Sequence, residues 1–236
     1  MKTPIALWTL SASLLAALAG CHAPGRPGPE PEIVRPEEIK DFATLYKQNC
    51  AGCHGEQGHH GLAVSLANPV YLAIAGREEL IRVTAEGVHG QLMPAFAKSK
   101  GGMLTDEQIR ILVDGMIHQW GKPHILDGQT PPPLHSELAG DPAAGGELFK
   151  TTCVRCHNAQ HTGPVAAGQL TDPSYLALIS DQSLRATILS GRAEDGMPDW
   201  RGFSSAPLTD QQVSNLVAWL AAQRSSAPGQ PYPEHP

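Results

Sequence analysis

Aromatic side chains are scarce in this chain, and acidic side chains outnumber basic ones. Phe, Trp and Tyr make up 5% of the 236 residues, and the formal net charge is −6 at pH 7. The shortage of positive charge argues against nucleic acid as a partner. Domains with so few large side chains have thin cores by themselves.

The first residues lack the length of a membrane-spanning helix. The apolar run from Ile5 to Ala19 is shorter than the roughly 20 residues that a spanning helix needs. It follows Lys2 and ends in small residues, as a secretory signal does. The stretch from Leu18 to Cys21 resembles a bacterial lipobox, which implies cleavage before Cys21 and acylation of Cys21. An uncleaved membrane anchor is the alternative. We expect an exported protein, lipid-anchored on the periplasmic or outer side of a bacterial membrane.

Cysteine is also rare, with five residues in the chain. Four of them lie in two copies of the motif Cys-x-x-Cys-His, formed by Cys50, Cys53 and His54 and by Cys153, Cys156 and His157. The motif is typical of covalent haem c attachment: the thiols bond to two vinyl groups and the His ligates iron. A shared zinc site would place the two Cys pairs about 15–20 residues apart, and two disulfides would leave both His residues unexplained. The motifs predict two haem c groups.

The two motifs belong to an internal repeat, at a nearly constant offset along the chain. Residues 68–72 (Asn-Pro-Val-Tyr-Leu) match residues 172–176 (Asp-Pro-Ser-Tyr-Leu), and residues 104–108 match residues 208–212. A Met-Pro pair recurs as Met93-Pro94 and Met197-Pro198. The sequence is therefore a tandem duplication of one module.

Each module is predicted to be helical. Pro36 should open a helix that runs toward Cys50, and Asp141 with Pro142 should open the matching helix toward Cys153. Both modules should close with a helix that begins at a capping box, Thr105 with Gln108 and Thr209 with Gln212. Short helices are expected at about 70–75, 78–86, 174–179 and 182–190. No segment shows sustained strand alternation, so the fold class is all-α, with two tandem domains that each enclose one haem.

The composition also indicates how these domains are connected. Pro and Gly are frequent after residue 21 and again between the two modules, which is typical of spacers. The predicted segments are a signal peptide (1–20), a tether (21–35), domain 1 (36–121), a Pro-rich linker (122–140), domain 2 (141–224) and a disordered tail (225–236).

The sixth ligand of each iron decides between electron transfer and chemistry at the metal. Met93 and Met197 are the candidates, because they recur at equivalent positions beside Pro. A single Met would more often fill a core. Met197 has no competitor in its module, whereas Met93 competes with His89, Met103 and Met116. His59, His60 and His161 are alternative iron ligands, but they are expected to be exposed polar residues. The same is expected of His118, His124 and His135.

Each module resembles a class I cytochrome c domain, and the whole resembles a membrane-tethered dihaem cytochrome c. The resemblance covers residues 36–121 and 141–224. It implies that the proximal His donates its other ring nitrogen to a carbonyl in a Gly-Pro turn. The Gly163-Pro164 pair fits this role for His157, with Pro164 supporting the ligand. In the first module, Gly61-Leu62 stands at the corresponding place.

The resemblance also implies that the first and last helices of each module cross through a small residue and aromatic ones. Gly146, Phe149 and Trp219 fit this pattern in the second module. In the first module Ala43 and Tyr46 fit, but Gly115 stands where Trp219 stands in the second. Trp120 or Met116 is therefore expected to compensate there.

A carrier of single electrons is the function that these features favour, with no catalytic residues. The expected partners are redox proteins: an oxidase, a reductase, a dehydrogenase or a quinol-oxidising complex. One alternative is a haem enzyme, peroxidase-like or acting on another small molecule, with its open iron in the first module. Another is the cytochrome subunit of a larger dehydrogenase or oxidase.

Overall fold

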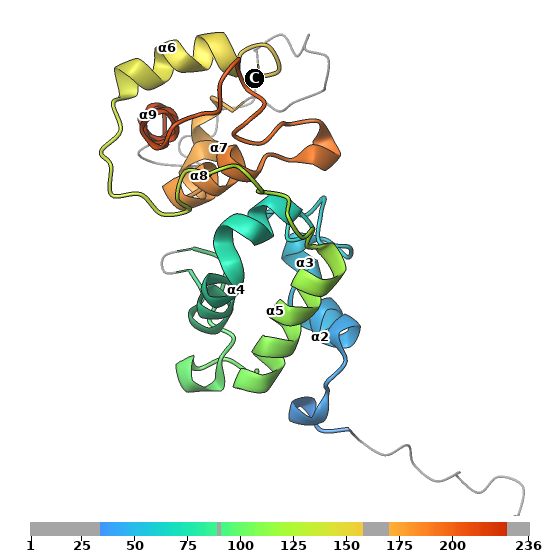
Figure 1. The fold of residues 1–236 in the computed structure, drawn as a ribbon. Coiled ribbons are helices and arrows are strands. Elements are labelled where there is room, and N and C mark those ends of the chain that lie inside the picture. Colours follow the sequence, from blue (N-terminus) through green and yellow to red (C-terminus); the bar gives the residue numbers. More distant parts are fainter. Residues whose placement is uncertain (1–33, 89–90, 158–169, 226–236) are drawn as a thin grey trace, which may run out of the picture. The chain divides into compact units, whose positions relative to one another are not determined.

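The computed structural model describes residues 34–88, 91–157 and 170–225 (Figure 1). The chain divides into two compact units, Met1–Pro36 and Glu37–Pro236. Only residues 34–36 of the first unit are described, so the predicted signal peptide, Cys21 and nearly all of the tether lie outside the described residues. So do His89, His161, Gly163, Pro164 and the tail after residue 225.

The described residues contain helices and no strands. In chain order the elements are η2 (Pro36–Glu38), α2 (Phe42–Asn49), α3 (Ala51–His54), α4 (Pro69–Glu86), η3 (Lys98–Lys100), α5 (Asp106–Trp120), α6 (Pro142–Thr152), α7 (Pro173–Leu178), α8 (Asp181–Ser190), η4 (Ala193–Asp195) and α9 (Asp210–Ala221). None of the helices in these ranges has both the length and the apolar character needed to span a bilayer.

In the first module, α2, α4 and α5 surround one core. The helix α2 begins at Phe42 because the side chain of Asp41 accepts a hydrogen bond from the Thr44 backbone N–H at 2.8 Å. The prediction that Pro36 opens this helix is wrong, since Pro36 starts only the short turn η2. Helix α4 bends at Gly76, where φ is 71°, and so comprises the two short helices predicted there.

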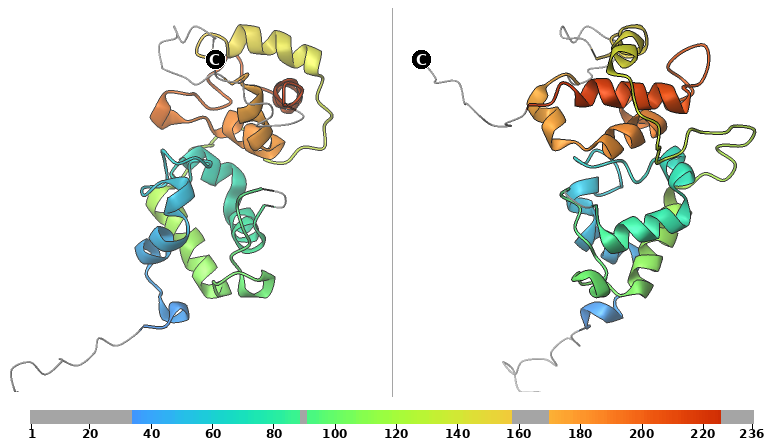
Figure 2. Two further views of the ribbon diagram at one scale, coloured as in Figure 1. Left: turned by 180° about the vertical axis from the view of Figure 1, so that it is seen from behind. Right: turned by 90° about the vertical axis from the view of Figure 1, so that its left-hand side faces the viewer.

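In the second module, α6 runs across α9, and α7 and α8 complete the core (Figures 1 and 2). The predicted starts are confirmed: Asp141 caps α6 with Pro142 in its first turn, and Thr209 with Gln212 forms the capping box of α9. Thr105 with Gln108 does the same for α5. These caps are local pairings of neighbouring residues, which is why the sequence alone predicts them.

The duplication persists in the backbone hydrogen bonds. Gly87 follows α4 as its C-cap, with its N–H bonded to Val83 O, and Gly191 follows α8 in the same way, with its N–H bonded to Thr187 O. Both glycines have positive φ, 71° and 67°. Further along, the Leu104 N–H donates to Phe96 O and the Leu208 N–H donates to Trp200 O. The segment that carries each Met-Pro pair is therefore held in the same way in both modules.

The crossing of first and last helices differs between the modules. In the second, the rings of Phe149 and Trp219 lie 4.4 Å apart, centroid to centroid. In the first, Trp120 makes edge contacts with Phe42 at 5.8 Å and with Tyr46 at 5.1 Å. Trp120, one of the two residues expected to compensate for Gly115, thus packs against the first helix, while the Phe42 ring lies on Gly115 itself.

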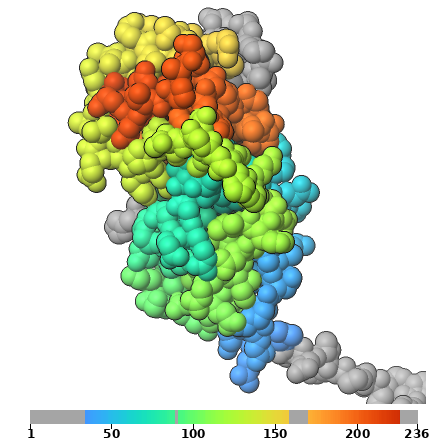
Figure 3. Space-filling model, in the orientation of Figure 1, coloured from blue at the N-terminus to red at the C-terminus, as the bar shows by residue number. Residues whose placement is uncertain are grey.

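The segment between the two modules lies against the second one (Figure 3), and side chains of that module bond to it. Arg201 donates to Ile125 O at 3.1 Å, and Gln211 donates to Ala139 O at 2.8 Å. Between these points, His135 Nδ1 lies 3.0 Å from Gln182 Oε1 of α8, while its Nε2 lies 2.8 Å from Glu79 Oε1 of α4. His135, expected only to be exposed, thus connects both modules while its side chain stays 54% exposed.

Candidate functional site

The first Cys-x-x-Cys-His motif forms one helical turn directly after α2. The Cys50 N–H bonds to Tyr46 O at 2.8 Å and closes α2, and the N–H groups of Cys53 and His54 then bond to Cys50 O at 3.2 and 3.0 Å. Residues three and four apart on a helix are neighbours. The turn therefore gathers two thiols and one imidazole from a stretch of five residues, as attachment to one porphyrin requires.

The second motif has the same backbone hydrogen bonds. The Cys153 N–H bonds to Phe149 O at 2.9 Å and closes α6, and the N–H groups of Cys156 and His157 bond to Cys153 O at 3.1 and 2.9 Å. None of the four motif cysteines takes part in a disulfide in the part of the chain that the structure describes. Burial raises the pKa of Cys50 to about 12 and also raises that of Cys153.

His54 is held in the state that an iron ligand needs. Its side chain lies in the interior, the residue being 8% exposed, and burial lowers its pKa, which favours the neutral ring. Its Nδ1 lies 2.8 Å from Val64 O. Because a carbonyl oxygen only accepts, the proton is on Nδ1, and the lone pair of Nε2 is free to ligate metal. The residues of the first module fit a c-type haem.

The loop after His54 is fixed by backbone contacts. The Ala63 N–H bonds to Cys53 O at 3.0 Å, and the Tyr46 hydroxyl donates to Gly55 O at 2.9 Å. A Cβ atom on Gly61 would stand 2.2 Å from Cys53 O, so only glycine permits this close approach. Sequence reasoning missed Val64 as the partner of His54, because any residue supplies a carbonyl. The predicted partner of His157, the turn at Gly163-Pro164, lies outside the described residues.

Met93 and Met197 lie in equivalent loops, each beginning at the glycine that ends the preceding helix. The Val88 N–H bonds to Met93 O at 3.0 Å. In the second module, Arg192 and Met197 exchange two backbone hydrogen bonds, each 3.0 Å long. Both Met residues are half-buried. Their assignment as iron ligands stays a prediction.

The two competing methionines of the first module have different surroundings. Met103 is 73% exposed, whereas Met116 is 3% exposed and belongs to the core packed by α5. The competitor His89 lies outside the described residues. Of the alternative His ligands, His60 lies 3.5 Å from Asp195 and carries a positive φ of 59°.

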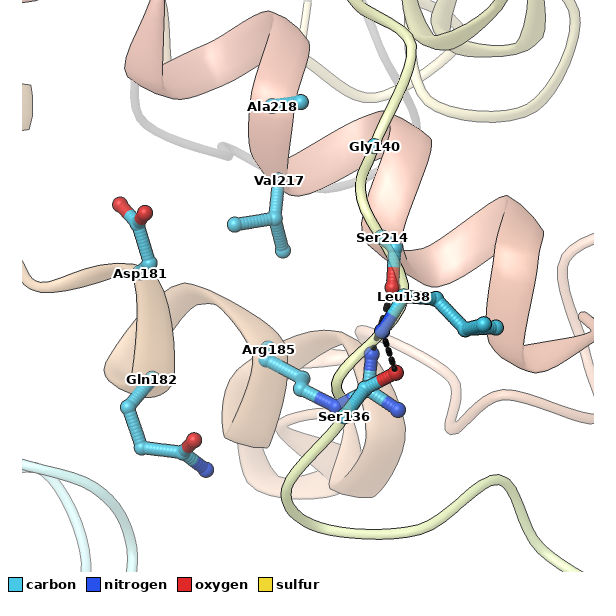
Figure 4. A pocket seen from close by; sticks show the side chains of 9 residues that line it. All are labelled: Ser136, Leu138, Gly140, Asp181, Gln182, Arg185, Ser214, Val217 and Ala218. Carbon is cyan, nitrogen blue, oxygen red and sulfur yellow. Dashed lines mark hydrogen bonds between the residues drawn. The ribbon is translucent and has the colours of Figure 1, made fainter.

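A cavity of about 200 Å³ lies beside Arg185, lined by the linker, α8 and α9 (Figure 4). Arg185 is 5% exposed, and each of its guanidinium nitrogens already has a protein acceptor. These acceptors are Pro133 O, Leu134 O, Ser214 Oγ and the Asp210 carboxylate. The Arg185 side chain therefore fastens the linker to α8 and α9, and the cavity contains none of the predicted haem residues.

Comparisons with known proteins agree with this duplicated site. The family described as "Cytochrome C oxidase, cbb3-type, subunit III" matches the chain twice, at residues 37–114 and 140–220. The double match confirms the all-α fold of two tandem c-type cytochrome domains.

Two individual relatives and one solved structure are also similar to this chain. The cbb3-type cytochrome c oxidase subunit FixP of Bradyrhizobium sp. (strain ORS 278) is 32% identical over 171 residues, which cover 67% of this chain and 53% of FixP. The chain thus spans about half the length of this relative. The cytochrome bc1 complex cytochrome c subunit of Mycobacterium tuberculosis is 24% identical over 218 residues, 85% of this chain and 71% of that protein. A chain of the Kuenenia stuttgartiensis reducing HAO-like protein complex aligns with a TM-score of 0.44 at 19% identity, over 83% of this chain and 99% of that one.

Proposed function

The chain belongs to the cytochrome c family that includes subunit III of cbb3-type cytochrome c oxidase, and on that premise we propose that it carries two haem c groups and passes single electrons between redox proteins. One observation carries the proposal. Both Cys-x-x-Cys-His motifs have the same backbone hydrogen bonds, each at the end of a helix, and each is followed by an equivalent Met-Pro loop.

In this proposal the side chains have distinct roles. Cys50 and Cys53 hold the first haem by thioether bonds, and Cys153 and Cys156 hold the second. His54 and Met93 would supply ligands to the first iron, and His157 and Met197 to the second. A bound haem supplies an iron that gains and loses one electron, and a Met ligand raises its reduction potential. The hydrogen bond from His54 to Val64 O keeps the imidazole oriented and its Nε2 unprotonated.

Two measurements on the purified protein test this function. Its intact mass should exceed that of the polypeptide by two haems. The ferric protein should show the long-wavelength charge-transfer absorption of Met-ligated haem, and the reduced protein should not bind carbon monoxide. A single haem, or carbon monoxide binding by the wild type, would contradict the dihaem carrier. The second result would favour an open-site haem enzyme.

The partner class follows from the relatives. By their names, FixP is a subunit of a cbb3-type oxidase and the mycobacterial relative is a subunit of a bc1 complex. The sequence allows an oxidase, a reductase, a dehydrogenase or a quinol-oxidising complex as partner. Of these, we expect a membrane-bound oxidase or quinol-oxidising complex. The test is to add quinol and this protein to washed membranes that contain such a complex, and to follow reduction of its haems by their absorption.

The location rests on the lipobox-like residues 18–21. Acylation of Cys21 would attach several acyl chains to one residue, and two or more chains give stable membrane binding whereas one gives only marginal binding. Cys21→Ser should release the protein from the membrane fraction of a bacterial host with both haems still bound. A variant that stays in the membrane would contradict lipid anchoring at Cys21.

A further inference from the structure

Asn68 uses every polar atom of its side chain, and does so across two modules. It is 4% exposed. Its Oδ1 accepts from the N–H groups of Val70 at 2.9 Å and Tyr71 at 3.1 Å, which caps α4. Its Nδ2 donates to Ser190 O at 2.9 Å and Gly191 O at 3.1 Å, at the end of α8 in the second module. One buried amide thus joins the start of one helix to the end of another.

On its own side, Asn68 belongs to the loop that orients His54. That loop begins with Val64, whose carbonyl accepts the His54 N–H. The loop is closed by the Ser65 hydroxyl and the Ala67 N–H, which both donate to Gly58 O at 3.2 and 2.9 Å. The Asn68 N–H bonds back to Ser65 O at 3.4 Å. Asn68 is therefore tied to the loop that holds His54.

On the other side, the two carbonyls lie at the base of the Met197 loop. Gly191 precedes Arg192, and Arg192 is paired with Met197 by two backbone hydrogen bonds. The last carbonyls of a helix have no partner within the helix and form the negative end of its dipole. An amide N–H₂ suits this position because it supplies two donors and no charge.

The repeat shows that this amide is not required for capping. The position of Asn68 corresponds to Asp172 in the second module. Asp172 Oδ1 accepts from the N–H groups of Ser174 at 2.9 Å and Tyr175 at 2.8 Å, the same cap geometry. Asp172 is exposed. A carboxylate caps this helix equally well, so the amide nitrogen of Asn68 serves the contact between modules.

Other contacts between the modules lie around Asn68. His60 approaches Asp195, His135 connects Glu79 with Gln182, and Ile74 packs against the core of the second module. The His60 and His135 side chains are 58% and 54% exposed, and ion pairs at such exposed side chains contribute little. Among the residues that the structure describes, Asn68 makes a buried polar link between the modules.

We propose that Asn68 is a positioning residue for electron transfer between the two haems, because it holds the His54 loop of the first module against the base of the Met197 loop of the second. This inference rests on the proposed dihaem function. The rate of electron transfer between two haems depends on their relative position, and a buried amide with all its hydrogen bonds made helps to fix the relative position of the two modules.

The decisive variant is Asn68→Asp, which keeps the capping oxygen, removes both N–H donors and places a negative charge at the negative end of α8. The haem content and Met-ligation spectra should stay as in the wild type. The rate of electron transfer between haems, measured after pulsed reduction, should fall about tenfold or more as the modules separate. Asp172→Asn, the same exchange reversed at the equivalent exposed position, should leave the rate unchanged.

A second readout does not depend on haem activity. Glu78 on α4 and Glu147 on α6 have side chains 87% and 77% exposed. Spin labels on E78C and E147C, measured in the reduced protein, should give one narrow distance distribution in the wild-type background and a broad one with Asn68→Asp. Asn68→Ser keeps a capping oxygen without adding charge, and should also broaden the distribution if Asn68→Asp fails to fold.

The outcomes separate this inference from the proposed function. An unchanged rate and distance distribution in Asn68→Asp would overturn the role of Asn68 while leaving the dihaem carrier intact. Equal slowing by Asp172→Asn would overturn it too. A wild type with one haem would contradict the proposed function, and the label distances would then still decide whether Asn68 holds the modules together.

Discussion

Phe42 packs directly on Gly115, so closely that a Cβ atom at Gly115 would stand 2.2 Å from Phe42 Cδ2. The second module has the reverse arrangement at the equivalent positions. There the glycine is Gly145 on the first helix, where an added Cβ would stand 2.0 Å from Asn215 O and 2.8 Å from the Trp219 Cβ, and the large residue is Trp219 on the last helix. The duplicated helix crossing has thus exchanged its large and small residues between the two helices.

This exchange predicts that the effect of Gly115→Ala on the free energy of unfolding changes sign when Phe42 is replaced. Gly115→Ala should destabilise the protein by about 1–3 kcal/mol, because the new methyl group overlaps the Phe42 ring. In a Phe42→Ala background the overlap is gone, and the same substitution should stabilise by up to about 1 kcal/mol through helix propensity. Denaturant unfolding of the four proteins with bound haem measures both values. Equal effects in the two backgrounds would contradict direct packing of Phe42 on Gly115.

The sequence predicts the features that depend on neighbouring residues. The capping boxes at Thr105 and Thr209, the cap at Asp141 and the bend in α4 all follow from residues within one or two turns. The start of α2 was predicted wrongly because Pro36 is a good first helical residue, yet the side chain of Asp41 forms the actual cap.

Other features depend on pairs of residues far apart in the chain. The position of Phe42 on Gly115 needs the crossing of α2 and α5, which local patterns do not contain. Val64 contributes only its backbone carbonyl to His54, and every residue has such a carbonyl, so the residue type does not reveal the contact. Asn68 resembles an ordinary helix cap in the sequence, and only the folded chain brings its amide nitrogen to Ser190 and Gly191.

The buried Arg185 should contribute far more stability than an exposed ion pair. Arg185→Met removes the guanidinium donors to Pro133 O, Leu134 O and the Asp210 carboxylate. Leu134 O keeps its bond from Gln182 and Asp210 keeps its bond from Ser136, but the Asp210 charge loses its ion pair, and breaking a buried pair by removing one partner costs about 3–5 kcal/mol. Lys150→Met is the matched control, since Lys150 and Glu147 form an ion pair with side chains 67% and 77% exposed, where about 0–1 kcal/mol is expected. Unfolding in denaturant compares them, and similar losses would contradict a fastening role for Arg185.

Glu79 should make stability depend on acid pH. Hydrogen bonds from Arg82 and, more weakly, His135 lower the pKa of its carboxyl in the folded protein. A lowered folded pKa stabilises the fold above the unfolded value of about 4.3, and the contribution is lost as the pH falls through the folded pKa. Glu79→Gln should therefore flatten the loss of stability below about pH 4.3. Denaturant midpoints across this range test it, and an unchanged pH profile in the variant would exclude Glu79 as a contributor.

The iron ligand of the first module can be assigned by comparing three methionines in one chain. Met93→Ala should remove the charge-transfer absorption of one haem and let the reduced protein bind one carbon monoxide, because removing an axial ligand opens the iron. Met103→Ala should change neither signal, since Met103 is 73% exposed and lies outside the core. Met116→Ala should leave both signals intact but lower the free energy of unfolding by about 2–5 kcal/mol, the cost of truncating a core Met. Carbon monoxide binding by Met103→Ala or Met116→Ala, with Met93→Ala unreactive, would assign the ligand to that residue and exclude Met93.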